Sequence, residues 1–370
     1  MRDYHGIIFA YSAAPELRTL VAHRTAASLP FCGRYRLIDL ALSSLRNAGI
    51  LDVGVIMQRD YQSLLDHIGS GKPWDMNRKS GGLRMLPPFG LPEYHRGEYA
   101  GTMEALNAVA SYIEDIPQKH IVLLQGNVCA NLDIADAIRF HEANHADVTA
   151  ICASKMDEGH YHYYTTNEDG YVDHIHFYRE PGAEGYASLE GYIIHKDVLL
   201  ELMKNCRSDR LYRFHRDAIP LFLEKGGKMN VYFHESYASM IRSVDDYYKA
   251  NMDMLCGCKR KQIFPADRPV RAKPHDEVSS YYSEGSSAHR CLVADNCIIE
   301  GKLENCIVFS GARIGKGAKL KNCILMRGCT VGEGAELSHV IVDKNSTINP
   351  SVTLVGSEKL PVVVPKFSNI

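Results

Sequence analysis

Short apolar runs alternate with amphipathic segments over the first 250 residues of the chain. Residues 6–10 form a run typical of a buried strand, and residues 38–48 place apolar side chains at the i, i+3, i+4 and i+7 spacing of a helix. Gly49 follows as a suitable C-cap. This alternation predicts right-handed βαβ units and a mainly parallel sheet covered on both faces. In such sheets, ligands bind beyond the carboxyl ends of the strands.

Later segments continue the alternation with one interruption. The sequence Asn-Glu-Asp-Gly at 167–170 is a strong hairpin turn between strand-like stretches, so an antiparallel excursion is expected there. We expect further strands at 53–57, 120–124 and 147–151, and further helices at 61–68, 101–113, 134–141 and 247–255. Residues 1–255 are therefore predicted to form a Rossmann-like α/β domain with a mainly parallel, mixed sheet.

The C-terminal part of the chain repeats itself every 17 residues. The residues Cys-Ile-Val-Phe at 306–309 recur as Cys-Ile-Leu-Met at 323–326 and as Val-Ile-Val-Asp at 340–343, and a second motif recurs at the same offset. Apolar residues six apart fill the gaps, which is the pattern of a hexapeptide repeat with close to three hexads per coil. We predict a left-handed parallel β-helix at 290–370, after a linker at 256–289. The flat outer faces of such a prism favour oligomerisation.

Composition narrows the classes of function to consider. A net charge of −2 gives no broad positive field, so we expect neither nucleic acid nor a membrane surface as a partner. A strand pattern begins almost at the N-terminus, and no apolar stretch approaches the roughly 20 residues that span a bilayer. We therefore expect no signal peptide and a cytoplasmic location. The 11 cysteines sit singly in apolar runs, as is typical of buried thiols in a reducing compartment.

Several histidines and cysteines invite comparison with metal sites. His160 with His162, and His174 with His176, are pairs two residues apart in strand-like segments that lack nearby convergent carboxylates. The Cys-Gly-Cys motif at 256–258 has no second cysteine pair at zinc-finger spacing. We therefore interpret the histidines as surface or packing residues and predict no metal site.

An ordered set of motifs carries a family resemblance. Phe-Cys-Gly-Arg-Tyr-Arg-Leu-Ile-Asp at 31–39 is followed by Tyr-Ala-Gly-Thr-Met-Glu-Ala at 99–105, Gly-Asn-Val at 126–128 and Glu-Gly-Tyr-Ile at 190–193. With the β-helix, this set resembles the glucose-1-phosphate adenylyltransferases (ADP-glucose pyrophosphorylases) over nearly the whole chain. The resemblance implies a nucleotidyltransferase-like first domain. In that family a sugar phosphate attacks the α-phosphorus of ATP, and glycine-rich backbone, Arg, Lys and carboxylate-held Mg²⁺ neutralise the phosphates.

The residues that handle phosphate and metal in that family are replaced in this chain. The family has a Gly-Gly-x-Gly-x-Arg-Leu loop after its first strand, whereas residues 11–17 read Tyr-Ser-Ala-Ala-Pro-Glu-Leu and contain no glycine. Five positions have lost the family's charge or reversed its sign: Glu16 for Arg, Ala26 for Lys, Asn127 and Met240 for two metal-binding Asp residues, and Glu180 for Lys. We therefore expect no intact catalytic residue and no cofactor for this chain, although its catalytic relatives use Mg²⁺.

This pattern of loss resembles the D-type, non-catalytic subunit of bacterial glucose-1-phosphate adenylyltransferase in glycogen synthesis. The resemblance implies a regulatory partner of a catalytic homologous subunit, in a heterotetramer, with a sugar phosphate or nucleotide as effector. A homo-oligomer of this chain alone stays open. Two other functions also stay open. One is a stand-alone sensor of sugar phosphates or nucleotides, and the other is an active enzyme with relocated residues, namely Arg18, Arg24, Lys72, Asp133 and Asp136.

Two sets of residues are candidates for ligand binding. The first set matches family positions around the nucleotide and sugar and comprises Gln58, Gly101, Thr102, Gly126 and Gly191. These residues also have a structural interpretation, in which they only complete the sheet and its turns. The second set consists of basic residues near the domain junction, where the family's effectors bind and where Arg and Lys clamp phosphates: Arg34, Arg36, Arg268, Arg271 and Lys273.

Overall fold

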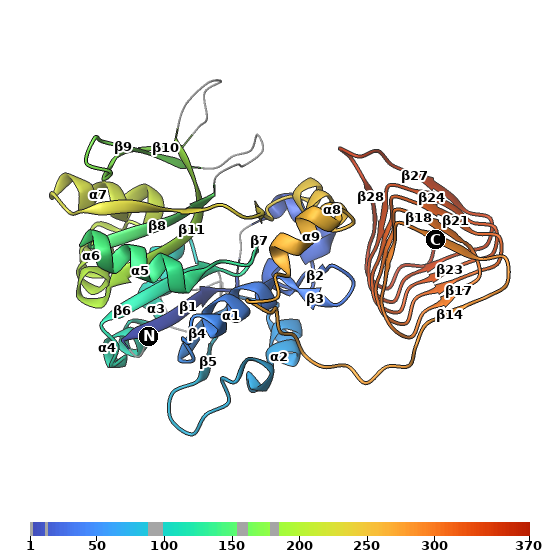
Figure 1. The fold of residues 1–370 in the computed structure, drawn as a ribbon, viewed down its shortest axis with the longest axis horizontal. Helices are drawn as coiled ribbons and strands as arrows, with labels where there is room; N and C mark the ends of the chain where they lie inside the picture. The colour runs from blue at the N-terminus through green and yellow to red at the C-terminus, as the bar shows by residue number, and fades with distance from the viewer. Residues whose placement is uncertain (1–2, 12–13, 88–98, 154–161, 178–184) are drawn as a thin grey trace.

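A computed structural model describes residues 3–11, 14–87, 99–153, 162–177 and 185–370 of the chain. In these residues an α/β domain is followed by a β-helix, whose coils stack beside it into a triangular prism (Figure 1). The connection 264–280, which contains neither helix nor strand, loops between the two domains. Within the described part of the chain, no helix is long and apolar enough to cross a membrane.

The centre of the α/β domain is a sheet with mostly parallel strands. Its strands run in the order β10-β9-β11-β6-β1-β4-β5, and β8 and β12 continue from β11. β1 is parallel to both its neighbours, whereas β11 is antiparallel to β6 and β8, so the mixed sheet expected from the sequence is confirmed. The strands are β1 (Tyr4–Phe9), β4 (Val53–Ile56), β5 (Leu83–Leu86), β6 (His120–Gln125), β8 (Val148–Ala153), β9 (Tyr163–Thr166), β10 (Val172–His176), β11 (Tyr186–His195) and β12 (Met229–His234).

Helices cover both faces of this sheet. Buried side chains of α1, α2 and α5 form one apolar cluster with the sheet, and those of α3, α4, α6 and α7 form another. The helices are α1 (Leu37–Asn47), α2 (Gln62–Ile68), α3 (Thr102–Ala108), α4 (Ala110–Asp115), α5 (Ile134–Asn144), α6 (Lys196–Asp209), α7 (Ile219–Glu224), α8 (Val244–Asp253) and α9 (Gly257–Ile263). The helix expected at 101–113 is two helices, because the backbone of Val109 leaves the helical region at φ −114° and ψ 25°.

The ends of α1 follow from its sequence. Asp39 accepts a hydrogen bond from the backbone N–H of Arg36 at 2.9 Å, which satisfies a donor at the N-terminus. Gly49 has φ +76°, a left-handed conformation that suits glycine. The Gly49 N–H bonds the carbonyl of Arg46 and the next N–H bonds that of Leu45, which is the Schellman arrangement. The predicted C-cap is therefore confirmed, and it directs the chain into β4.

The β-helix consists of three parallel sheets with five strands each within the described residues. Ile307, Ile324 and Ile341 pair in successive coils, so the 17-residue repeat found in the sequence is a ladder of stacked strands. This arrangement is that of the predicted left-handed β-helix. The sheets contain β14 (Tyr281–Tyr282), β17 (Ile298–Ile299), β20 (Arg313–Ile314), β23 (Thr330–Val331) and β26 (Thr347–Ile348); β15 (Ser287–His289), β18 (Lys302–Glu304), β21 (Lys319–Lys321), β24 (Glu336–Ser338) and β27 (Thr353–Val355); and β16 (Leu292–Val293), β19 (Ile307–Val308), β22 (Ile324–Leu325), β25 (Val340–Val342) and β28 (Val362–Val364).

The segment 256–289, expected as a linker, has regular structure at both ends. Helix α9 occupies its beginning, and Ile263 at the end of that helix is fully buried. Strands β14 and β15 at its other end already belong to the first coil of the β-helix. The stretch without helix or strand is therefore shorter than expected and covers residues 264–280.

The two domains share one apolar core. Leu17, Leu20 and Tyr247 of the α/β domain belong to the same buried cluster as Ile307 and Ile324 of the β-helix. The hydroxyl of Tyr248 also donates to the carbonyl of Asn322 at 2.7 Å across the boundary. Because a large apolar interface resists relative domain motion, the boundary holds side chains of both domains in fixed positions.

Candidate functional site

The carboxyl ends of β1 and β6 meet where ligands of a parallel sheet bind. Phe9 and Gln125 are paired at these ends, and Thr102, Glu190 and His215 lie around them. Together they line a hollow of about 10 Å³. We call the place formed by these five residues the sheet-edge site.

The segment after β1 packs against the β-helix and does not form a phosphate loop in its described residues. Residues 15–21 form the 3-10 helix η1 (Pro15–Val21). Leu17 and Leu20 are fully buried in the interdomain core, whereas Glu16 is exposed to solvent. Because Pro15 has no N–H and Leu17 faces the core, this backbone offers no glycine-rich cradle of N–H groups.

The two positions at which the family keeps metal-binding carboxylates lie side by side. Met240 ends β13 (Ala238–Met240) and pairs with Val128 in β7 (Val128–Ala130). The Asn127 side-chain amide donates to the carbonyl of Ile241 at 2.9 Å, and Met240 is 1% exposed. Neither side chain provides an anionic oxygen for Mg²⁺, which prefers carboxylates.

The remaining degenerate positions divide between the core and the part of the chain outside the described residues. Ala26, at the family's lysine position, lies in the 3-10 helix η2 (Ala26–Ser28) and is 1% exposed. Its methyl group belongs to the interdomain core, where a lysine would bury its charge. Glu180 lies outside the described residues.

Two of the predicted ligand residues lie in or next to the sheet-edge site. Close packing explains why glycine occupies the three predicted glycine positions. Thr102 lines the site, and Gly191 follows Glu190 in β11. A Cβ atom on Gly101 would come within 2.1 Å of the Tyr212 carbonyl oxygen, and one on Gly126 would come within 2.8 Å of the Ala27 Cβ.

A Cβ atom on Gly191 would come within 3.3 Å of Ile151. Gln58 is half-buried beyond β4. The three glycines therefore fit the structural interpretation, since each is needed for backbone packing.

The residues proposed as relocated catalytic groups are engaged elsewhere. Arg24 is 4% exposed and forms an ion pair with the fully buried Asp343 of the β-helix. Asp133 pairs with Arg268 at 2.6 Å and accepts from the N–H of Asp136.

Asp136 in turn accepts from Tyr232 and Arg139. Arg18 lies exposed in η1, and Lys72 lies exposed in the 3-10 helix η3 (Lys72–Trp74). The structure therefore gives no support to an active site rebuilt from these five side chains.

A second cavity, which we call the interdomain pocket, lies between the α/β domain and the β-helix and has a volume of about 370 Å³. The α/β domain contributes the strands β2 (Pro30–Phe31) and β3 (Tyr35–Arg36) and the turn between them. The basic side chains that line the pocket are Arg34, Arg36, His67, His275, Arg327 and Lys344. Four Arg and Lys side chains thus face two carboxylates, those of Glu277 and Asp295. The pocket has the charge and the volume to receive a phosphorylated small molecule.

The β-helix side of the interdomain pocket is a single column of the repeat. Asp295, Ser310, Arg327 and Lys344 each lie two residues beyond a strand of the same sheet, in successive coils. Glu277 accepts hydrogen bonds from Ser310 at 3.2 Å and from Arg327 at 2.8 Å. The sequence prediction missed Arg327 and Lys344, although the repeat offset of 17 residues puts them in one column.

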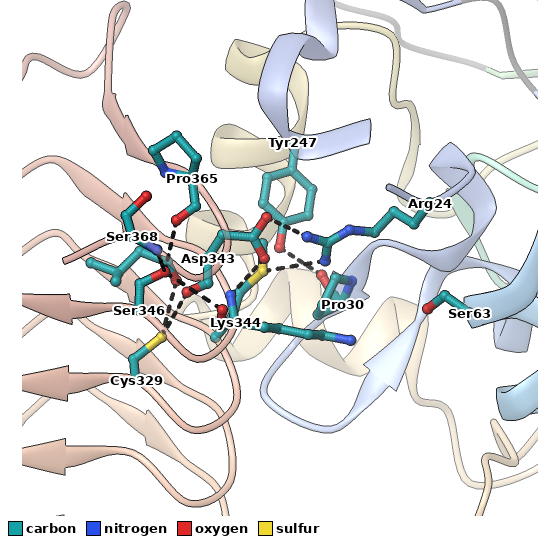
Figure 2. Close-up of polar contacts among 12 residues, drawn as sticks. Arg24, Pro30, Ser63, Tyr247, Cys329, Asp343, Lys344, Ser346, Pro365 and Ser368 are labelled. Atoms are coloured by element: carbon teal, nitrogen blue, oxygen red, sulfur yellow. Dashed lines mark hydrogen bonds and ion pairs between the residues drawn. The ribbon is translucent and has the colours of Figure 1, made fainter. Parts of the chain in front are cut away.

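Cations crowd the inner end of this pocket. Figure 2 shows Asp343 and Lys344 on the β-helix side of the boundary, with the Asp343 carboxylate directed at Arg24. Burial, with the nearby Arg36 and Arg24 charges, lowers the pKa of Lys344 to about 7. Burial also lowers the pKa of Arg36 to about 10. A bound anion would favour the charged form of Lys344 and of Arg36 and would therefore oppose the lowering of both pKa values.

The effector candidates from the sequence split between the pocket and the connection. Arg34 and Arg36 line the interdomain pocket, and Arg36 also donates to the Ser63 carbonyl at 2.5 Å. The other three connect residues 264–280 to the α/β domain and do not line this pocket, and their role in effector binding stays a prediction. They bind as follows: Arg268 to Asp133, Arg271 to Asp75 at 3.7 Å and through its N–H to Ser43, and Lys273 to the Asp66 carbonyl at 2.7 Å.

Comparison with known proteins agrees with the two-domain architecture. Residues 5–256 match the family described as Nucleotidyl transferase, and residues 274–360 match the family described as GlmU-like, C-terminal hexapeptide. The chain is 30% identical to the glycogen biosynthesis protein GlgD of Bacillus subtilis (strain 168), over 85% of this chain and 81% of that protein. It is also 30% identical to the glucose-1-phosphate adenylyltransferase of Geobacillus stearothermophilus, over 84% and 81% of the two chains.

A third relative, the glucose-1-phosphate adenylyltransferase of Clostridium kluyveri, is 28% identical over 86% of this chain and 84% of its own. The similarity thus extends through both domains and is nearly equal for relatives with different names. The chain belongs to the glucose-1-phosphate adenylyltransferase family.

Proposed function

We propose that this chain is a regulatory subunit of a bacterial glucose-1-phosphate adenylyltransferase in glycogen synthesis and that it does not transfer adenylyl groups at a useful rate by itself. The observation that carries the proposal is that Asn127 and Met240 occupy the family's two metal positions, where Met240 pairs with Val128 and the Asn127 amide donates to the Ile241 carbonyl. A buried amide and a buried thioether cannot replace two carboxylates as Mg²⁺ ligands.

The other replaced residues also weaken the binding of phosphate. Glu16 and Ala26 remove the family's Arg and Lys, and the segment that would bind pyrophosphate packs as η1. Removing one such electrostatic group typically costs a factor of roughly 10² to 10³ in rate. Effects within a cooperating set are not additive, but every loss weakens the same stabilisation of phosphate charge.

The interdomain pocket supports a regulatory role. Its walls come from both domains, so a ligand that bridges Arg36 and Lys344 contacts the α/β domain and the β-helix together and stabilises their docked arrangement. A phosphorylated metabolite is the ligand class that four Arg and Lys side chains favour. In a complex, such a ligand would alter the catalytic partner through the docked domains, which is a coupling between two distinct sites.

The expected partner is a catalytic homologous subunit, in a heterotetramer. Equal similarity to a protein named GlgD and to proteins named glucose-1-phosphate adenylyltransferase fits a chain that keeps the family's docking surfaces. The competing proposal is a stand-alone sensor of sugar phosphates or nucleotides. Such a sensor would bind its ligand in the same interdomain pocket but would not change the activity of a partner subunit.

The test is to purify the chain alone, a catalytic homologue alone, and the two after co-expression. Adenylyl transfer from ATP to glucose 1-phosphate and the mass of each assembly are then measured together. The chain alone is expected to be inactive, and the mixed assembly is expected to show a changed response to phosphorylated effectors. A turnover by the chain alone within the usual range of about 1–10³ s⁻¹ would refute the loss of catalysis.

Two variants separate regulation from simple assembly. Lys344→Met removes a pocket charge, and Lys319→Met removes an exposed charge on β21 outside this pocket. In the mixed assembly, Lys344→Met is expected to abolish the altered effector response, and Lys319→Met is expected to keep it. If the partner's kinetics are the same with and without the chain, the regulatory role is excluded and the sensor proposal gains support.

A further inference from the structure

Three potential metal ligands from separate segments converge beside the sheet-edge site. His162 directly precedes β9, Glu190 lies within β11, and His215 lies in the π-helix η4 (Phe214–Ala218). One ligand atom from each side chain lies within 4.8 Å of the others. No local sequence pattern indicates this cluster, because 28 and 25 positions separate its members and the only histidine close to His162 in the motif is His160.

The donor set is one that transition metals prefer. Two imidazoles and one carboxylate are the protein ligands of many zinc sites with an open fourth position, and the set contains too few oxygens for Mg²⁺ or Ca²⁺. The rings of His162 and His215 are stacked, with centroids 4.3 Å apart and planes 7° apart. Because a metal ion lies near the plane of each imidazole that binds it, one of the two rings must turn before both can bind the same ion.

Burial and neighbouring charge favour neutral rings. Burial lowers the pKa of His162 well below its ordinary value, and burial also lowers the pKa of His215. A neutral imidazole has a free lone pair at neutral pH, so protons do not compete with the metal. Two stacked neutral rings also avoid the repulsion that two imidazolium ions would suffer.

Hydrogen bonds around the cluster orient its ligands. The Nε2 atom of His162 lies 3.1 Å from the Tyr164 hydroxyl and 3.3 Å from the Tyr192 hydroxyl. Arg242 donates to Oε1 of Glu190 at 2.5 Å. Partners of this kind fix the ring and the carboxylate of metal sites, and a carboxylate keeps a second oxygen for the metal.

The backbone at Glu190 is in an uncommon conformation. Glu190 has φ +52°, a left-handed value for a residue that is not glycine, within a register shift of β11 between Ser188 and Gly191. Bulges of this kind redirect side chains, and they are concentrated near functional sites. Here the irregular backbone holds the carboxylate on the same side of the sheet as the two histidines.

We propose that His162, Glu190 and His215 bind one divalent transition-metal ion, with Zn²⁺ as the best match to the donors. Metal–nitrogen bonds of about 2.0–2.1 Å place neighbouring ligand atoms of a tetrahedral site about 3.3 Å apart. The ligand atoms lie within 4.8 Å of one another, so metal binding requires both the His215 ring and the Glu190 side chain to rotate toward the ion. The fourth position is open to water, since the hollow at the sheet-edge site, of about 10 Å³, has room for about one water molecule.

The experiment titrates Zn²⁺ into the chelator-stripped full-length chain and measures heat and stoichiometry. The thiols of the half-buried Cys256 and the exposed Cys258, whose Sγ atoms are 2.6 Å apart, would form a competing site. The measurements therefore use Cys256→Ser/Cys258→Ser as the background. One Zn²⁺ per chain is expected in this background.

Matched variants locate the ion. His215→Ala and Glu190→Gln are each expected to weaken Zn²⁺ binding at least tenfold, whereas His289→Ala, which removes an exposed histidine on β15, is expected to leave it unchanged. Circular dichroism checks that each variant is folded. If His215→Ala is unfolded, the result for Glu190→Gln, which keeps the shape of the side chain, tests the proposal in its place. Absence of stoichiometric binding in the background, or equal binding in all three variants, would overturn the proposal.

Discussion

The sheet edge and the interdomain pocket differ in the positive charge that they present. At the sheet edge, the metal positions hold Asn127 and Met240, and the Arg242 guanidinium is bound to Glu190. In the interdomain pocket, Arg36, Arg327 and Lys344 come together. The contrast shows that the fold is present without the family's charged residues at the metal positions, while basic side chains gather in a cavity at the domain boundary.

Arg24 connects the two regions. By its place in the sequence it belongs to the family's phosphate-handling motif, yet its side chain is paired with Asp343 of the β-helix. Asp343 occupies a column that holds Phe309 and Met326 in the preceding coils, so a single change from apolar to acidic creates the partner. A charge suited to phosphate now stabilises domain docking.

The largest expected effect comes from breaking this pair. Asp343→Leu leaves Arg24 buried without a counter-charge and is expected to lower the free energy of unfolding by about 3–5 kcal/mol. The double variant Arg24→Met/Asp343→Leu is expected to recover most of the loss, because two apolar side chains replace two buried charges. Urea unfolding of each variant measures these free energies.

The control is an exposed ion pair between a basic and an acidic side chain on the surface of the β-helix. Lys319→Met breaks the exposed pair with Glu336, whose separation is 2.7 Å, and is expected to change stability by no more than about 1 kcal/mol. If Asp343→Leu is as mild as Lys319→Met, Arg24 is not held by the β-helix and is available to the sheet edge.

A smaller effect is expected from Gly101→Ala. The added Cβ would meet the Tyr212 carbonyl oxygen at 2.1 Å, and that oxygen also accepts from the N–H of Met103. We expect a loss of about 1–3 kcal/mol in stability, as for other overpacked sites, measured by thermal and urea unfolding. An unchanged stability together with weaker nucleotide binding would instead assign Gly101 to a surviving nucleotide site.

The smallest expected effect is a pH dependence of anion binding in the interdomain pocket. The pKa of Lys344 is lowered to about 7, so its charge is present at pH 6 and mostly absent at pH 8. Sulfate keeps its own charge over this range, and its affinity is expected to fall up to about tenfold from pH 6 to pH 8. Calorimetric titration at several pH values measures the fall.

Lys344→Met provides the check on this assignment. Sulfate affinity in the variant is expected to be low and nearly independent of pH. A pH dependence that persists in Lys344→Met would assign it to His67 or His275, which also line the pocket.

The sequence predicted the fold well where hydrophobic spacing is local. The 17-residue offset became the strand ladders, and Gly49 ended α1 as its position indicated. The helix expected at 101–113 and the linker expected at 256–289 were less accurate. The backbone of Val109 leaves the helical region and divides the expected helix in two. The burial of Ile263 holds the start of the expected linker in a helix.

The candidate site was harder to predict because its residues meet only when the domains dock. Arg34 and Arg36 were expected near the junction, but Arg327 and Lys344 are separated from them by nearly the whole chain. The pairing of Arg24 with Asp343 likewise depends on how the β-helix packs against η1. No local pattern encodes such contacts, although the repeat register places Arg327 and Lys344 on one edge.

The most direct test is a crystal structure of the chain grown with ATP, Mg²⁺ and inorganic phosphate. Phosphate density is expected in the interdomain pocket between Arg36, Arg327 and Lys344, with no Mg²⁺ beside Asn127. A nucleotide seated at the sheet edge, with its phosphates and Mg²⁺ ordered next to Asn127 and Met240, would contradict the loss of catalytic charge.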